Sequence, residues 1–97
     1  MTEKTLETDQ MLFVGLLQSF VSSAWIQLGK RENPLTGKTV VNLDEAKFTI
    51  DMLEMLQKKT RGNLSDTEQQ ILSTALTELK ISFVDLKSKQ SSESESE

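Results

Sequence analysis

The sequence has no cysteine, no histidine and no tyrosine, and only one proline and one tryptophan among its 97 residues. Without cysteine, the chain has no disulfide to stabilise a small domain and no thiol nucleophile. Without histidine, it has no side chain whose ordinary pKa lies near neutral pH, and the common zinc ligand sets cannot form. We therefore expect a protein that is not an enzyme, with no catalytic residue, no cofactor and no metal site.

The net charge of −4 is concentrated at the two ends of the chain. Residues 1–9 hold three acids and one base, and residues 88–97 also hold three acids and one base, so the segment between them is neutral. Neither end carries enough apolar surface to offset the entropy of ordering. We predict a flexible N-terminus over 1–8, a single helical domain over 9–87 and a disordered Ser/Glu tail over 88–97.

Residues 10–29 form an uncharged run that is long enough to be weighed as a membrane span. Polar residues such as Gln18 and Ser22 recur at helical spacing on one side, whereas apolar residues such as Leu17 lie on the other. This pattern is typical of an amphipathic helix over about 9–29 that packs on a protein core. A membrane location is therefore disfavoured.

Capping signals mark the starts of two later helices. Asn42 precedes Glu45 by three residues, and Ser65 precedes Glu68 by the same spacing, as in a capping box. The predicted helices span about 9–29, 43–60 and 65–87. The sequence thus predicts an all-α protein, a small three-helix bundle with flexible acidic ends.

The second predicted helix has two apolar sides. One stripe contains Leu43, Ala46, Ile50 and Leu53, and Phe48, Met52 and Met55 point to roughly the opposite side. Both stripes could be core in a monomer. We favour the alternative that a subunit or partner covers one face, either that of Phe48, Met52 and Met55 or the small-residue stripe of the first helix. Only two other helices are available to cover these surfaces. The candidate interface residues are Trp25, Phe48, Met52 and Met55.

The charged residues of this helix have the spacing of ion pairs. Lys47, Asp51, Glu54 and Lys58 fall in one arc at i, i+4 positions. The pair Asp51 and Glu54 also has the chemistry for acid–base work or a hard metal ion. The neighbouring lysines make a solvated ion-pair face the better interpretation.

The last residues of the second helix are basic. Lys58, Lys59 and Arg61 precede the Gly62-Asn63 turn. The basic turn Lys58-Arg61 suggests an alternative function as a nucleic-acid or ribonucleoprotein accessory protein, although cations at a helix C-terminus also complement the helix dipole. A weaker alternative is peripheral membrane association through the first helix.

Several short motifs together carry a family resemblance. They are Gln27-Leu28-Gly29, Asn33-Pro34-Leu35-Thr36-Gly37-Lys38, Asn42-Leu43-Asp44-Glu45-Ala46-Lys47, Ile50-Asp51-Met52-Leu53, Lys59-Thr60-Arg61-Gly62-Asn63-Leu64 and Leu79-Lys80-Ile81-Ser82-Phe83-Val84. With these motifs, the chain from Phe13 to Val84 resembles the bacterial family called domain of unknown function 1844. The resemblance implies a small cytoplasmic bacterial protein, and it supplies no catalytic or cofactor residue.

The resemblance also directs attention to two signature turns. Their residues are Asn33, Pro34, Gly37, Lys58, Lys59, Arg61, Gly62 and Asn63. Backbone geometry alone accounts for glycine, asparagine and proline at such positions. We predict a non-enzymatic module for protein interaction or self-association that acts through apolar helix faces. Its partner would be a second copy or another protein, with no small-molecule substrate.

Overall fold

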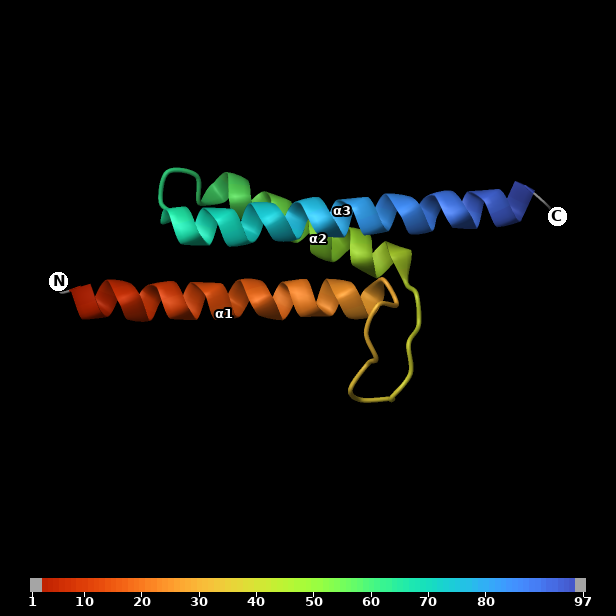
Figure 1. Ribbon diagram of the computed structural model, residues 1–97, viewed down its shortest axis with the longest axis horizontal. Coiled ribbons are helices and arrows are strands. Elements are labelled where there is room, and N and C mark those ends of the chain that lie inside the picture. Colours follow the sequence, from red (N-terminus) through yellow and green to blue (C-terminus); the bar gives the residue numbers. More distant parts are fainter. Residues whose placement is uncertain (1–2, 96–97) are drawn as a thin grey trace.

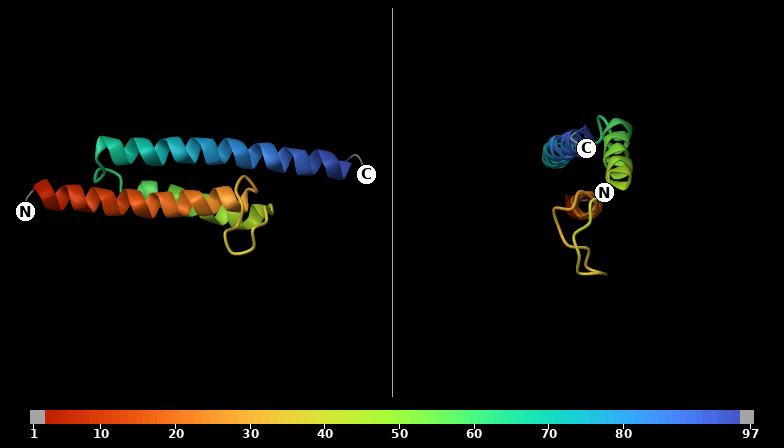
Figure 2. Two further views of the ribbon diagram at one scale, coloured as in Figure 1. Left: turned by 60° about the horizontal axis from the view of Figure 1, so that its bottom comes forward. Right: turned by 90° about the vertical axis from the view of Figure 1, so that its right-hand side faces the viewer.

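The computed structural model describes residues 3–95, with side chains described over 7–90. It contains three helices, α1 (Glu3–Gln27), α2 (Leu43–Lys59) and α3 (Asp66–Glu95), and this part of the chain has no strand beyond one isolated bridge. α1 and α3 run in the same direction and α2 returns between them (Figure 1). Seen from the end, the three helices form a triangle (Figure 2). The predicted all-α, three-helix architecture is confirmed.

Two helix ends lie outside the predicted bounds. α1 begins at Glu3 and not at residue 9, and α3 continues to Glu95 and not only to residue 87. No glycine or proline follows Gly62, so no residue type that breaks helices interrupts α3, and extending an existing helix costs little once it has nucleated. Residues 1–2 and 96–97 lie outside the described residues. The flexibility predicted for both ends stays a prediction.

The bundle is elongated because its helices are offset along their axes. α1 projects at one end and α3 at the other (Figure 1), and the molecule measures 61 × 29 × 16 Å. Its radius of gyration is 16.0 Å, against about 12.5 Å for a compact domain of this length. Its accessible surface is 7111 Å², against about 5,600 Å² for a typical monomer of this mass. The projecting ends supply part of this excess.

A small apolar core holds the three helices together. Its buried members are leucine, isoleucine and alanine side chains from all three helices and from Leu28, which follows α1: Leu17, Ala24, Leu28, Ala46, Ile50, Leu53, Leu72, Leu76 and Leu79. Larger side chains such as Phe13 and Phe83 pack against this core while remaining partly exposed. The stripe of α2 that contains Leu53 is therefore the core stripe.

The end of α1 is closed by a hydrogen-bonded glycine cap. The Gly29 N–H donates to the Ile26 carbonyl at 3.0 Å, and the Lys30 N–H donates to the Trp25 carbonyl at 2.9 Å, which is the Schellman arrangement. Gly29 has a φ of 74°, in the left-handed region that glycine adopts without strain. This cap turns the chain so that Leu28 forms its bridge with Val41.

The two predicted N-caps form, with one difference. Ser65 and Glu68 make the full capping box, since the Glu68 N–H donates to Ser65 Oγ at 3.2 Å and the Ser65 N–H donates to Glu68 Oε1 at 2.8 Å. Asn42 Oδ1 accepts from the Glu45 N–H at 3.1 Å. The Asn42 N–H, however, donates to the Gln27 carbonyl at 2.7 Å, so the loop is tied to α1.

Polar side chains also join the helices. The Thr49 hydroxyl donates to Gln27 Oε1 at 2.7 Å, which links α2 to the end of α1. The Ser65 hydroxyl donates to Gln10 Oε1 at 2.8 Å, which links the start of α3 to α1. Lys47 pairs with Asp51 at 2.8 Å as predicted, whereas Glu54 pairs with Lys80 of α3 at 2.9 Å.

The ion pair between Glu54 and Lys80 predicts a small sensitivity to acid. The hydrogen bond from Lys80 and its positive charge hold the pKa of Glu54 below its ordinary value of 4.5. A carboxylate whose pKa is lowered by folding stabilises the fold above its unfolded-state pKa, and this contribution is lost as the pH falls through the folded-state pKa. We expect Glu54→Gln to lower the free energy of unfolding at pH 7 by at most about 1 kcal/mol, because the pair is exposed.

Urea unfolding of both proteins at pH 7 and pH 3 measures this difference. It should shrink as the pH is lowered below 4.5, where the wild-type carboxylate becomes protonated. An equal difference at the two pH values would show that the carboxylate charge does not stabilise the fold.

Candidate functional site

One face of α2 carries five residues at alternating spacings of three and four: Glu45, Phe48, Met52, Met55 and Lys59. This spacing places them along one stripe of the helix, which we call the α2 seam. Phe48 is 67% exposed and Met55 is 46% exposed, while Met52 is half-buried. The other two helices therefore leave most of the α2 seam uncovered, and the interpretation that both stripes are core does not describe the single chain.

An apolar stripe of α1 lies beside the α2 seam. A groove of about 570 Å³ runs between the two helices, and its lining includes Phe20 from α1 together with Phe48 and Met52 from α2. Leu16 and Leu12 precede Phe20 by four and eight residues, so they continue the same side of α1. We call the α2 seam together with Leu12, Leu16 and Phe20 the α1–α2 face.

The exposed apolar area of this face is comparable to the largest apolar patch of a typical monomer. Leu12 is 67% exposed and Leu16 is 46% exposed, in addition to the values for Phe48 and Met55. At about 200 Å² for a fully exposed large side chain, these four contribute about 450 Å². This is within the range of about 300–600 Å² for the largest apolar patch on a typical monomer, and such patches are often functional.

Trp25 lies away from the other three predicted interface residues. It follows Phe20 by five residues, which is a rotation of about 140° around α1. Its side chain is partly buried and packs against the core. Phe48, Met52 and Met55 thus share one face, and Trp25 does not belong to it.

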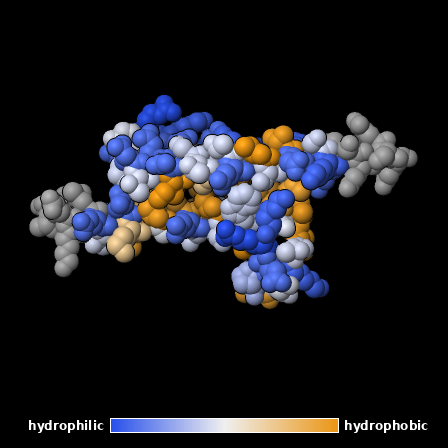
Figure 3. All heavy atoms as spheres, viewed as in Figure 1, coloured by the Kyte–Doolittle hydropathy of each residue, from blue (hydrophilic) through white to orange (hydrophobic). Residues whose placement is uncertain are grey.

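A second apolar area is visible between α1 and α3. Figure 3 shows apolar atoms in the hollow that separates these two helices. On α3, the half-buried residues Ile71 and Ala75 line a shallow hollow of about 370 Å³ together with polar side chains.

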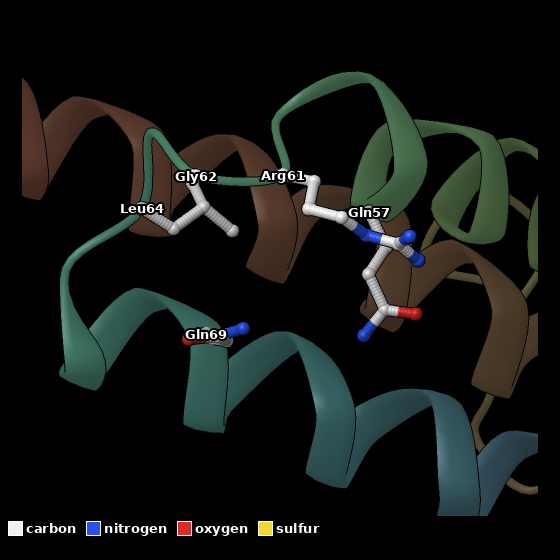
Figure 4. A pocket seen from close by; sticks show the side chains of 5 residues that line it. All are labelled: Gln57, Arg61, Gly62, Leu64 and Gln69. Atoms are coloured by element: carbon white, nitrogen blue, oxygen red, sulfur yellow. The ribbon is translucent and has the colours of Figure 1, made fainter.

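The cations of the predicted basic turn point in different directions. Lys58 and Lys59 line a hollow that also contains Asp51 and Glu54. Arg61 instead lines a separate hollow of about 360 Å³, beside Gln57 and across from Gln69 of α3 (Figure 4). The turn therefore offers no continuous basic surface, and carboxylates lie within its positive region.

Gly62 and Asn63, which follow the three cations in the same signature turn, shape the backbone. Gly62 adopts a φ of 85°, and the Asn63 N–H donates to the Thr60 carbonyl at 2.9 Å. These contacts reverse the chain between α2 and α3. The physical requirement of the turn explains both residue types.

The turn from Asn33 to Lys38 is held by its own hydrogen bonds. Asn33 Oδ1 accepts from the Leu35 N–H at 2.9 Å, and the Asn33 carbonyl accepts from the Gly37 N–H at 2.7 Å. Pro34 lies within this turn, and Gly37 adopts a φ of 70°. The loop that carries it extends away from the helices (Figure 2), with Leu35 92% exposed.

Few charged side chains of the described residues are buried or grouped together. Within 3–95, no group of three or more acidic side chains is placed to hold a metal ion. Among the side chains described over 7–90, Glu68 is the only charged one that is buried, and its carboxylate caps α3. Over the same residues, no helix has both the length and the apolar character needed to cross a membrane.

The α1 residues of the α1–α2 face, Leu12, Leu16 and Phe20, are not among the interface residues that the sequence predicts. Their spacing of four residues was the available signal. That signal does not show which side of α1 the other helices cover.

The fold and this face define a small all-α domain of three helices with one uncovered apolar face. The chain belongs to the family described as a domain of unknown function (DUF1844), whose family model matches residues 10–85. The matched segment is the part where the three helices pack together, without most of the projecting ends. No curated protein and no solved structure matches the chain.

Proposed function

We propose that this protein is a non-enzymatic interaction module that binds an amphipathic protein helix on its α1–α2 face. The observation that carries the proposal is the exposure of Phe48, at 67%, and of Met55, at 46%, beside an apolar groove. Long apolar side chains around a groove are suited to receiving the apolar face of a helix. A second copy of the chain or another protein can supply that helix.

A non-enzymatic role fits the chemistry of the side chains. The sequence has no histidine, cysteine or tyrosine, and the buried carboxylate of Glu68 is occupied in a helix cap. Proton transfer or nucleophilic attack would need a group poised near its reacting partner. We also propose that the protein acts in the bacterial cytoplasm, and this location is supported only by the family resemblance.

The two alternative functions have less support. Nucleic-acid binding needs a basic stripe, whereas Lys58 and Lys59 share their hollow with two carboxylates and Arg61 lies in another hollow. Association of α1 with an anionic membrane surface needs basic residues beside the apolar face, and the first 29 residues contain only Lys4. Protein interaction requires neither feature.

The double variant Phe48→Asp/Met55→Asp tests the proposed function. Two carboxylates on the α1–α2 face would have to lose water on binding, so we expect association with protein partners to be abolished. Light scattering after size exclusion measures self-association, and affinity capture from native cell extract measures other partners. Circular dichroism should show an unchanged helix content, since both residues are exposed.

A matched control is available on α3. Ile81 is 65% exposed and Val84 is 64% exposed, and both lie on a different helix, so Ile81→Asp/Val84→Asp also introduces two carboxylates at exposed apolar positions away from the α1–α2 face. We expect the association of this control to equal that of the wild type. Full retention of every association by Phe48→Asp/Met55→Asp would refute a role for the α1–α2 face.

A further inference from the structure

We propose that a second copy of this chain covers the α1–α2 face, with the two α2 helices antiparallel across a twofold axis near Met52. This inference rests on the proposed function, and it names the occupant of the face and its orientation. A homodimer with twofold symmetry requires a surface that is complementary to itself, so that each residue pair occurs twice. The α2 seam meets this requirement in its charges, its spacing and its area.

The charges of the α2 seam change sign along its length. Glu45 lies at the start of α2 and Lys59 lies at its end, with Asp44 and Lys58 adjacent to them. An antiparallel partner places the acidic start of each helix opposite the basic end of the other. A parallel partner would instead place like charges together, which is unfavourable.

These seam charges are free to pair with another chain. The three ion pairs within the described part of the chain use other residues, and none of them involves Glu45 or Lys59. The helix dipole favours acids at the start and bases at the end of a helix, but it acts equally on every side. It does not explain why Glu45 and Lys59 both fall on the apolar stripe.

The spacing along the α2 seam is symmetric about Met52. Phe48 precedes Met52 by four residues and Met55 follows it by three, while Glu45 and Lys59 lie seven residues to either side. A twofold axis at Met52 therefore brings Phe48 of one copy against Met55 of the other. The same operation brings Glu45 of each copy to the level of Lys59 of the other.

The available area matches that of a standard interface. Two copies of the α1–α2 face contribute about 900 Å² of exposed apolar surface, from the estimate of about 450 Å² each. Because apolar atoms make up about 60% of an interface, this corresponds to about 1,500 Å² in total. Stable complexes bury about 1,200–2,000 Å². On α3, by comparison, Ile81 and Val84 are the only large apolar residues that are mainly exposed among those described.

Disulfide cross-linking of single-cysteine variants tests the orientation. The natural chain has no cysteine, so each introduced thiol can pair only with its counterpart in another copy. We expect Met52→Cys to cross-link to itself under mild oxidation. We expect an equimolar mixture of Glu45→Cys and Lys59→Cys to form mostly the mixed cross-link, which intact-mass measurement identifies, whereas each alone forms little. Ile81→Cys gives the level that results from random collision.

Charge reversal provides a second measurement that does not depend on introduced thiols. In the antiparallel dimer, Glu45→Lys and Lys59→Glu each create two like-charge contacts. Because these contacts are exposed to solvent, each variant should weaken dimerisation only about threefold to tenfold at low salt. The double variant Glu45→Lys/Lys59→Glu should restore the dissociation constant of the wild type. Sedimentation equilibrium measures all four proteins.

The outcomes separate this inference from the proposed function. Suppose that Phe48→Asp/Met55→Asp disrupts the dimer, but Glu45→Cys cross-links to itself and the mixture of Glu45→Cys and Lys59→Cys does not form the mixed cross-link. These results would contradict the antiparallel arrangement and would still support the interaction module. If the wild-type chain is still monomeric at about 100 µM, a second copy does not cover the α1–α2 face. In that case, capture of a partner by the wild type and not by the double variant would still support the module.

Discussion

Replacing Leu53 with alanine is expected to lower the free energy of unfolding by about 2–5 kcal/mol. Leu53 is fully buried near the middle of α2, within the core that joins all three helices. Truncation removes buried methyl groups and leaves a cavity that a rigid core fills only in part. Since domains of this size have only about 5–15 kcal/mol of stability, the midpoint of thermal unfolding should fall by at least about 10 °C.

Leu35→Ala is the matched control for this substitution. Leu35 is 92% exposed in the loop between α1 and α2, so the same chemical change there removes almost no buried surface. We expect its free energy of unfolding to lie within about 0.5 kcal/mol of the wild-type value in chemical denaturation. Both variants and the wild type must be measured at one protein concentration, because dimerisation stabilises the folded state. A loss below 1 kcal/mol for Leu53→Ala would contradict the close-packed core.

Replacing Gly29 with alanine should destabilise the protein by about 1–3 kcal/mol. Gly29 has a φ of 74°, and a Cβ atom at this position would lie 2.6 Å from Cγ2 of Val41. The Val41 side chain is partly exposed and can rotate away, so the left-handed backbone supplies most of the cost. The variant should also weaken the bridge between Leu28 and Val41, which positions the start of α2.

Gly15→Ala is the control that separates backbone strain from the loss of glycine itself. Gly15 lies within α1, and a Cβ there would meet no atom within 4 Å. Because alanine favours the helix over glycine, we expect this variant to be more stable than the wild type by up to about 1 kcal/mol. Thermal unfolding followed by circular dichroism measures both. Equal midpoints for Gly29→Ala and the wild type would show that the left-handed cap is not required.

Much of the fold could be predicted because its signals are local. The capping box of Ser65 and Glu68 and the cap of Asn42 formed at the predicted positions, since these contacts join residues three positions apart. Gly29, Gly37 and Gly62 adopt the positive φ values that their turns require. Such features depend only on neighbouring residues, so a single sequence contains the information for them.

Other features required the three helices to be placed. Glu54 was expected to pair within α2, yet it reaches Lys80 of α3, because the closest cation is decided by packing. The Asn42 N–H donates to Gln27, where the sequence suggested a contact with Glu45. α3 also extends to Glu95, beyond the predicted end at residue 87, because a helix that has formed can propagate through residues that bury no apolar surface.

The sequence by itself determined the helical class, the positions of the two signature turns and the two-sided apolar pattern of α2. It could not decide which stripe of α2 becomes core and which stays exposed, because both have the same periodicity. The tertiary structure decides this: α1 and α3 cover the stripe of Leu53 and leave Phe48 and Met55 in solvent. The physical reason is geometric, since two neighbouring helices can bury only one side of a third.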